Sequence, residues 1–133
     1  DTVVAHDGSQ AGGFDIPNLK TAQEFTKTQN FNATTLSDAS TIAWDASSNQ
    51  VAKVTLGGNR TLGAATNQVD GAVYVLTVIQ DGSGSRTLSF NSNYKFTGGS
   101  APTLSTAASA TDVLVFLSNG TNMLEIGRSL NVS

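Results

Sequence analysis

Residues able to transfer protons are few in this 133-residue chain, and their positions do not suit catalysis. The single histidine, His6, lies in a glycine-rich stretch at positions 1–18. A serine nucleophile needs a base within hydrogen-bond reach, and the sequence contains no G-x-S-x-G motif that would present such a serine. We therefore expect no Ser-His-Asp hydrolase.

The acidic residues mostly occupy positions typical of turns and caps. Asp70 and Asp81 precede glycine, where an aspartate usually accepts hydrogen bonds from its own turn, and Asp38 is expected to cap locally. Asp45 and Glu125 lie within strand-like segments, so a hydrolase that uses a pair of carboxylates would have to use these two. A metal would need several convergent ligands, and no calcium-loop motif occurs. We expect no metal, no cofactor and no enzymatic activity.

Recognition of a surface is chemically better supported than turnover. Trp44, Tyr74 and Tyr94 offer aromatic faces for stacking on a sugar ring. Trp44 is expected in the core or at a subunit contact, and Tyr74 within a buried strand, whereas Tyr94 precedes a glycine-rich loop that a ligand can reach. The arginines are better candidates for ion pairs than for ligand clamps. The candidate ligand-binding residues are Tyr94, Lys95, Asn59, Arg60 and Arg86.

Uncharged polar residues dominate the composition. Thr, Ser, Asn and Gln contribute 49 residues, whereas only 17 are charged, the net charge is −3 and cysteine is absent. Such a chain has no basic stripe for nucleic acid. It also has no disulfides and no cysteine-based zinc site. No apolar run approaches the roughly 18 residues that a membrane span requires. Nucleic-acid binding and membrane spanning are therefore not expected.

Strand-forming segments recur beyond Phe31, separated by turns rich in Gly and Asn. Val51–Leu56 alternates like a strand with one wet face. Val73–Ile79 and Val113–Leu117 are apolar on both faces and are expected to be central strands covered on both sides. Asn119-Gly120 predicts an antiparallel hairpin. The predicted strands are 32–36, 41–45, 51–56, 61–62, 73–80, 86–90, 94–96, 113–118 and 123–128.

These elements predict an all-β fold, an antiparallel, jelly-roll-like β-sandwich of about eight strands at residues 31–133. Residues 1–30 are expected to form a leader or neck. Asn18 can cap a short helix there, since Leu19, Ala22 and Phe25 are spaced three apart, and an extended neck is equally consistent. Because the chain begins at Asp1 without methionine, we expect a fragment of a longer polypeptide.

A series of motifs between Thr34 and Ile126 resembles a module found near the C-terminal ends of tailed-bacteriophage structural proteins, in tail fibres, tail needles and head fibres. The resemblance covers about 90 residues. It implies a virion appendage, usually a homotrimer, whose globular tip meets the host surface, and it supplies no functional residue. The motifs are Thr34–Asp45, Val54–Leu62, Asp70-Gly71, Val78–Asp81, Gly84–Leu88, Tyr94–Phe96, Ala101–Leu104 and Ser118–Asn122.

Residues and resemblance together predict a non-catalytic, trimeric virion tip that presents loops 57–60, 81–85 and 97–110 to a host glycan or outer-membrane receptor. The leader would join the domain to a fibre shaft. A purely structural trimerisation or capping domain is the first alternative. A polysaccharide depolymerase that uses Asp45 and Glu125 is a weaker one.

Overall fold

The computed structural model describes residues 22 and 24–133, and the folded unit within it runs from Phe31 to Ser133. Most of the expected leader, and with it the choice between a helix and an extended neck after Asn18, lies outside the described residues. Residues 24–32 contain neither helix nor strand.

The folded unit consists of nine strands and one short 3-10 turn, η1. A six-stranded sheet has the order β1-β3-β5-β8-β9-β7, and a three-stranded sheet has the order β2-β4-β6. The bounds are β1 Ala33–Thr35, β2 Thr41–Ile42, β3 Val51–Leu56, β4 Arg60–Leu62, β5 Val73–Gln80, β6 Leu88–Phe90, β7 Tyr94–Lys95, η1 Thr97–Gly99, β8 Thr111–Ser118 and β9 Met123–Ser129.

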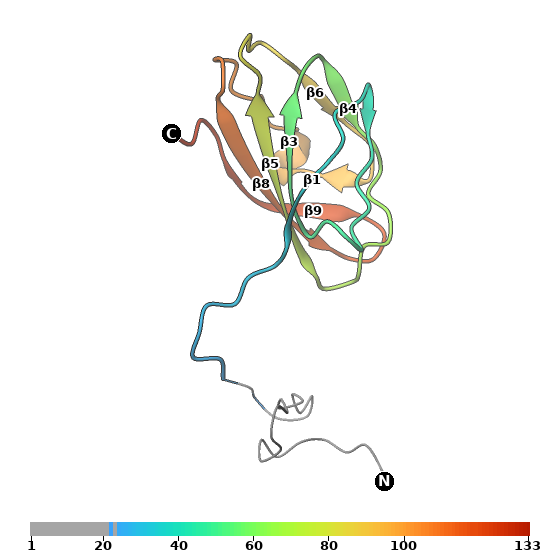
Figure 1. Cartoon of the computed structure of the whole chain (residues 1–133). Helices are drawn as coiled ribbons and strands as arrows, with labels where there is room; N and C mark the ends of the chain where they lie inside the picture. The colour runs from blue at the N-terminus through green and yellow to red at the C-terminus, as the bar shows by residue number, and fades with distance from the viewer. Residues whose placement is uncertain (1–21, 23) are drawn as a thin grey trace. The chain divides into compact units, whose positions relative to one another are not determined.

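The first six strands alternate between the two sheets (Figure 1). Strands β1, β3 and β5 join the larger sheet, and β2, β4 and β6 form the smaller one, so the chain winds around the core. Each of these strands runs in the same direction as the preceding strand of its own sheet. The pairs β1–β3, β3–β5, β2–β4 and β4–β6 are therefore all parallel. Antiparallel pairing occurs between β5 and β8 and between β8 and β9.

The all-β prediction is confirmed, with two sheets on either side of one core. The strand directions correct the expected antiparallel, jelly-roll-like arrangement, because the larger sheet is mixed and the smaller one is wholly parallel. Parallel neighbours need a crossover between them. Here a strand of the opposite sheet supplies that crossover in place of a helix.

Local patterns explain most strand bounds. In β3, Ala52, Val54 and Leu56 are buried while Lys53 and Thr55 are exposed, as the alternation predicts. The hairpin predicted at Asn119-Gly120 joins β8 to β9. Gly120 adopts φ 89°, which glycine reaches without the steric penalty of a side chain.

An aromatic cluster fills the core between the sheets. The ring of Trp44 stacks on Tyr94 at an interplanar angle of 14° and meets Tyr74 and Phe116 edge-on. The Trp44 Nε1 donates to the carbonyl oxygen of Asn49 over 2.8 Å, so its one polar atom is satisfied. Trp44 and Tyr74 are therefore core residues, as one reading of the sequence predicted.

Strands β5 and β8 are central neighbours in the larger sheet, but only one of their faces is fully buried. Side chains such as Leu76 and Leu114 point into the core. The alternate ones, such as Val75 and Val115, remain partly exposed. The expected cover on both sides is thus absent within the described part of this chain, because the second sheet packs against a single face.

Candidate functional site

Loops 57–60 and 81–85 and the second half of loop 97–110 lie together at one end of the folded unit. Loop 81–85 contacts loop 97–110 through two backbone hydrogen bonds. Ser85 N donates to Thr106 O over 2.7 Å, and Ser109 N donates to Asp81 O over 3.0 Å. Segments more than twenty residues apart therefore form one continuous surface.

Loop 57–60 joins this surface through Thr87. The side-chain Oδ1 of Asn59 accepts a hydrogen bond from Thr87 N over 3.0 Å. Arg60 N donates to Thr87 O over 2.9 Å, in the parallel pairing of β4 with β6. We call residues 57–60, 81–87 and 102–110 the loop cluster.

Gln80 connects two parts of the loop cluster from the core side. Its side chain is almost fully buried, and its Nε2 donates to Arg86 O over 2.8 Å and to Ser105 O over 2.9 Å. Its Oε1 accepts from Arg86 N over 2.9 Å. Buried polar groups are normally hydrogen-bonded in this way. The sequence signal was a glutamine at the inward phase of an apolar strand, and sequence reasoning missed it.

Asp112 fixes the second half of loop 97–110. Its Oδ2 accepts from Ser105 N, and its Oδ1 accepts from the Ser105 hydroxyl and from Asn131 N, each over 2.7 Å. The carboxylate at the start of β8 thereby ties the loop to the C-terminal segment. Aspartate side chains often bond nearby backbone N–H groups, and Asp112 does so for two segments at once.

Two neighbouring ion pairs border the loop cluster. Arg60 contacts Asp38 over 2.7 Å, and Arg86 contacts Asp81 over 2.9 Å. Hydrogen bonds from Arg60 and Arg86 hold the pKa of Asp38 and of Asp81, respectively, below its usual value. Asp81 also accepts from the backbone N–H groups of Ser83 and Gly84, as predicted for an aspartate that serves its turn. Both arginines are therefore engaged in ion pairs, which the sequence favoured over ligand clamps.

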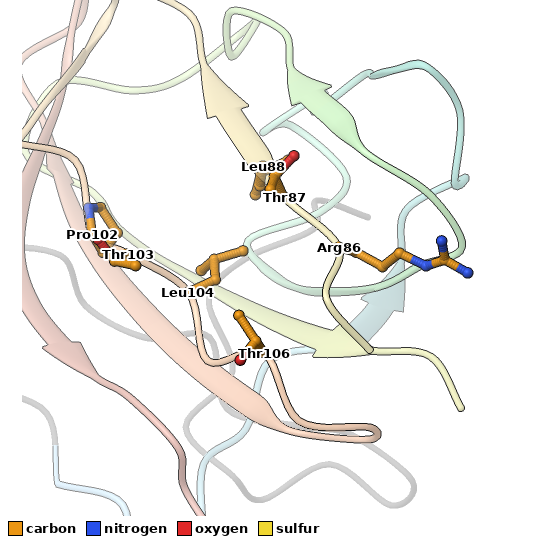
Figure 2. A pocket seen from close by; sticks show the side chains of 7 residues that line it. All are labelled: Arg86, Thr87, Leu88, Pro102, Thr103, Leu104 and Thr106. Atoms are coloured by element: carbon orange, nitrogen blue, oxygen red, sulfur yellow. The ribbon is translucent and has the colours of Figure 1, made fainter. Parts of the chain in front are cut away.

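A pocket of about 170 Å³ opens between loop 97–110 and the start of β6 (Figure 2). Leu88 and Leu104 supply buried apolar surface, and three threonines also line the pocket. The guanidinium of Arg86 points away from the other lining side chains in Figure 2, toward its ion pair. The lining residues are Arg86, Thr87, Leu88, Pro102, Thr103, Leu104 and Thr106.

Tyr94 and Lys95 lie away from the loop cluster. Tyr94 is buried, and its hydroxyl donates to Gly63 O over 2.7 Å. Burial also raises the pKa of this hydroxyl well above its usual value. The enclosed ring has no free face for a sugar, because β7 pairs with the distant strand β9 and turns the ring inward. Lys95 is exposed on β7. The structure thus groups Asn59, Arg60 and Arg86, and assigns Tyr94 to the core.

Residues 21–123 match a family model described as "Putative phage tail fibre C-terminal domain". The match covers most of the folded unit. The chain belongs to this family. No curated protein and no solved structure matches it. The domain is accordingly part of a bacteriophage virion appendage, as the motif series implied.

The two carboxylates that a hydrolase would need are both occupied in this tail fibre domain. Asp45 accepts hydrogen bonds from Ser47 and Asn67, which lower its pKa. Burial raises the pKa of Glu125, but hydrogen bonds from Arg128 and from Thr97 N outweigh it, and the pKa is lowered overall. Each group is set up to stay ionised.

The described residues of the tail fibre domain contain no group of three His, Cys, Asp or Glu side chains that could hold a metal ion. Within the same residues, no helix is long and apolar enough to cross a membrane. The chemistry that the loop cluster offers consists of hydroxyl, amide and backbone groups around a small apolar pocket.

Proposed function

We propose that this tail fibre domain is a non-catalytic attachment tip, which binds a host-surface glycan or outer-membrane receptor through the loop cluster. One observation carries the proposal: loops 57–60 and 81–85 and residues 102–110 converge on one hydrogen-bonded surface that contains a pocket. Loops positioned by a rigid scaffold are where binding residues concentrate. Of the five candidate ligand-binding residues, Asn59 is the one that is both exposed and part of this surface.

The loop cluster is preorganised for binding. Gln80 and Asp112 hold the loop backbones from the buried side, so little ordering would accompany ligand capture. Leu88 and Leu104 offer apolar contact, and the threonine hydroxyls around them offer hydrogen bonds, a combination typical of small-molecule sites. A saccharide, which has apolar ring faces and many hydroxyls, suits this combination.

Absence of turnover is part of the proposal. A glycosidase needs a general acid with a raised pKa beside a second carboxylate. The pKa of Asp45 and that of Glu125 are both lowered, which disfavours the protonated form at neutral pH. Both candidates for a depolymerase are thus poorly suited to donate a proton.

Threefold assembly is also proposed, with residues 1–30 joining residues 31–133 to a fibre shaft. Closed symmetric homo-oligomers are the rule for soluble assemblies, and a trimer would cover apolar surface that one copy leaves exposed. Phe25 and Phe31 are 58% and 62% exposed, which fits a neck that copies share. The alternative, a purely structural capping domain, needs this assembly but no ligand.

Competition for adsorption tests the binding proposal. Purified full-length chain in excess should block adsorption of the phage that carries this fibre. Thr103→Trp would fill the pocket and should reduce the block at least tenfold. Thr121→Trp, in the hairpin at the opposite end of β8, is the matched control and should leave it unchanged. A wild-type chain that does not compete would favour the capping alternative. Equal competition by both variants would place binding outside the pocket.

A further inference from the structure

The outer face of the larger sheet has an aliphatic centre. We define this face as the side of β3, β5, β8, β9 and β7 that points away from the core. Strand register places Val75 between Val51 and Val115, and places Leu117 beside Leu124. The aliphatic side chains of this face are Val51, Val73, Val75, Ile79, Val113, Val115, Leu117 and Leu124, all partly or fully exposed.

The outer face of the smaller sheet carries polar residues instead. Its outward row consists of Thr41, Thr61 and Ser89, which lie in register and are all exposed. The outward row of the smaller sheet thus consists of hydroxyl-bearing residues only, whereas the outer face of the larger sheet combines eight aliphatic side chains with Thr55, Thr77, Thr111 and Ser129. Leaving aliphatic surface in water costs about 25 cal/mol per Å² relative to burial. Exposed aliphatic patches of this kind are typical of interaction surfaces.

The low charge of this face favours an apolar partner. Among its described residues, the charged ones are Lys53 on β3 and Lys95 on the edge strand β7, and both flank the aliphatic centre. The pocket of the loop cluster is lined by other residues, so that pocket does not explain the aliphatic side chains of this face. Aliphatic sheet faces pack well against one another at a separation of about 10 Å.

We infer that the outer face of the larger sheet is the surface through which copies of this chain associate. Four strands at their usual spacing and eight residues of length present about 500 Å² per copy. Three copies that turn these faces toward a common axis bury about 1,500 Å² in total, with each copy dividing its face between two neighbours, and this exceeds the roughly 1,000 Å² expected of a biological interface. The inference rests on the proposed trimer and specifies its contact: three copies turn this face toward a common axis, and Lys53 and Lys95 reach water at its rim.

Charge substitution tests the interface in the full-length chain. Val115→Lys would place an unpaired charge in the centre of the face and should weaken association at least tenfold, as measured by analytical ultracentrifugation. Thr61→Lys introduces the same side chain on the outer face of the smaller sheet and should leave association unchanged. Circular dichroism of both variants shows whether each remains folded.

Cross-linking provides a second readout that does not require Val115→Lys to fold. The chain has no cysteine, so Thr77→Cys and Thr61→Cys each introduce one thiol, on the two opposite outer faces. A short bismaleimide should join Thr77→Cys chains into dimers and leave Thr61→Cys chains unlinked.

The outcomes separate this inference from the proposed function. A stable wild-type trimer that is unaffected by Val115→Lys and not linked at Thr77→Cys would overturn the inference and leave the trimer intact. A wild-type monomer would overturn both the trimer and this contact, while adsorption competition would still test binding. A monomer whose Thr77→Cys thiol resists maleimide would show that this face is covered within one copy, which also overturns the inference.

Discussion

The side chain of Gln80 hydrogen-bonds both backbone groups of Arg86. Its Nε2 donates to Arg86 O over 2.8 Å, and its Oε1 accepts from Arg86 N over 2.9 Å. The buried Gln80 amide thus makes with Arg86 the two hydrogen bonds that a neighbouring strand would otherwise make, just before β6 begins. The guanidinium of Arg86 pairs with Asp81 at the surface. The geometry of the loop cluster therefore depends on a residue that a ligand would not touch.

Replacing Gln80 with leucine should destabilise the domain and loosen the loop cluster. Gln80→Leu removes three hydrogen bonds and leaves the two Arg86 groups and Ser105 O without this partner. Unsatisfied buried groups cost about 1–3 kcal/mol each, so we expect the free energy of unfolding to fall by at least about 2 kcal/mol. Chemical denaturation measures this loss, and hydrogen exchange at the Arg86 amide should accelerate.

Gln50→Leu is the control for this substitution. Gln50 makes one side-chain hydrogen bond, from its Nε2 to Val73 O over 3.0 Å, at a less buried site. We expect a loss below about 1 kcal/mol, since a single exposed hydrogen bond is readily replaced by water. Equal losses in the two variants would contradict the anchoring role of Gln80.

Alanine at position 84 should disrupt the contact between loops 81–85 and 97–110. Gly84 adopts φ 71°, and a Cβ there would lie 2.5 Å from Thr106 O and 2.8 Å from Ala108 N. Both neighbours are backbone atoms that cannot rotate away. Strain at positive φ and overpacking each cost about 1–3 kcal/mol. We therefore expect Gly84→Ala to lower the free energy of unfolding by at least about 2 kcal/mol and to reduce adsorption competition.

Gly71→Ala separates conformational strain from steric overlap. Gly71 also has positive φ, 87°, but a Cβ there would meet no atom within 4 Å. This variant should lose only the strain contribution, about 1 kcal/mol. If Gly71→Ala proved as damaging as Gly84→Ala in thermal unfolding, close packing of the loops would not be the reason for glycine at position 84.

Acid should weaken the ion pairs beside the loop cluster. The pKa values of Asp38 and Asp81 lie below the ordinary value of 3.8 in the folded state. The unfolded chain therefore binds more protons at low pH. Their contribution to stability is present above the ordinary value and is lost as the pH falls through the lowered values. The thermal unfolding temperature, measured from about pH 7 down to about pH 2, should decrease once the pH is below about 4.

Asp81→Asn should flatten this acid dependence, because the titrating group of one pair is removed. The isosteric amide keeps acceptor capacity for the turn but not the charge. Asp70→Asn is the control, since Asp70 makes no side-chain hydrogen bond within the described part of the chain. An Asp81→Asn profile that matched the wild type throughout the acid range would show that the Arg86 pair does not contribute to the pH dependence.

The sequence by itself determined the strands and several turns. The bounds of β3 follow from alternation and those of β5 from an apolar run, and turn residues such as Asn49, Gly57, Gly71 and Asp81 flank both strands. The β8–β9 hairpin follows from Asn119-Gly120 in the same way. The sequence also indicated, one by one, the three loops that form the loop cluster, and its motif series indicated the tail fibre family.

Pairing direction and position in space were decided by the tertiary structure. A strand alternates identically beside a parallel or an antiparallel neighbour, so local pattern could not show that β1, β3 and β5 run the same way. Tyr94 is buried because β7 pairs with β9, a contact across almost thirty residues. Val75 and Val115 have the same local pattern whether a second layer covers them or not, since cover depends on what packs against the sheet. Local patterns record which faces prefer burial, and only long-range packing determines what buries them.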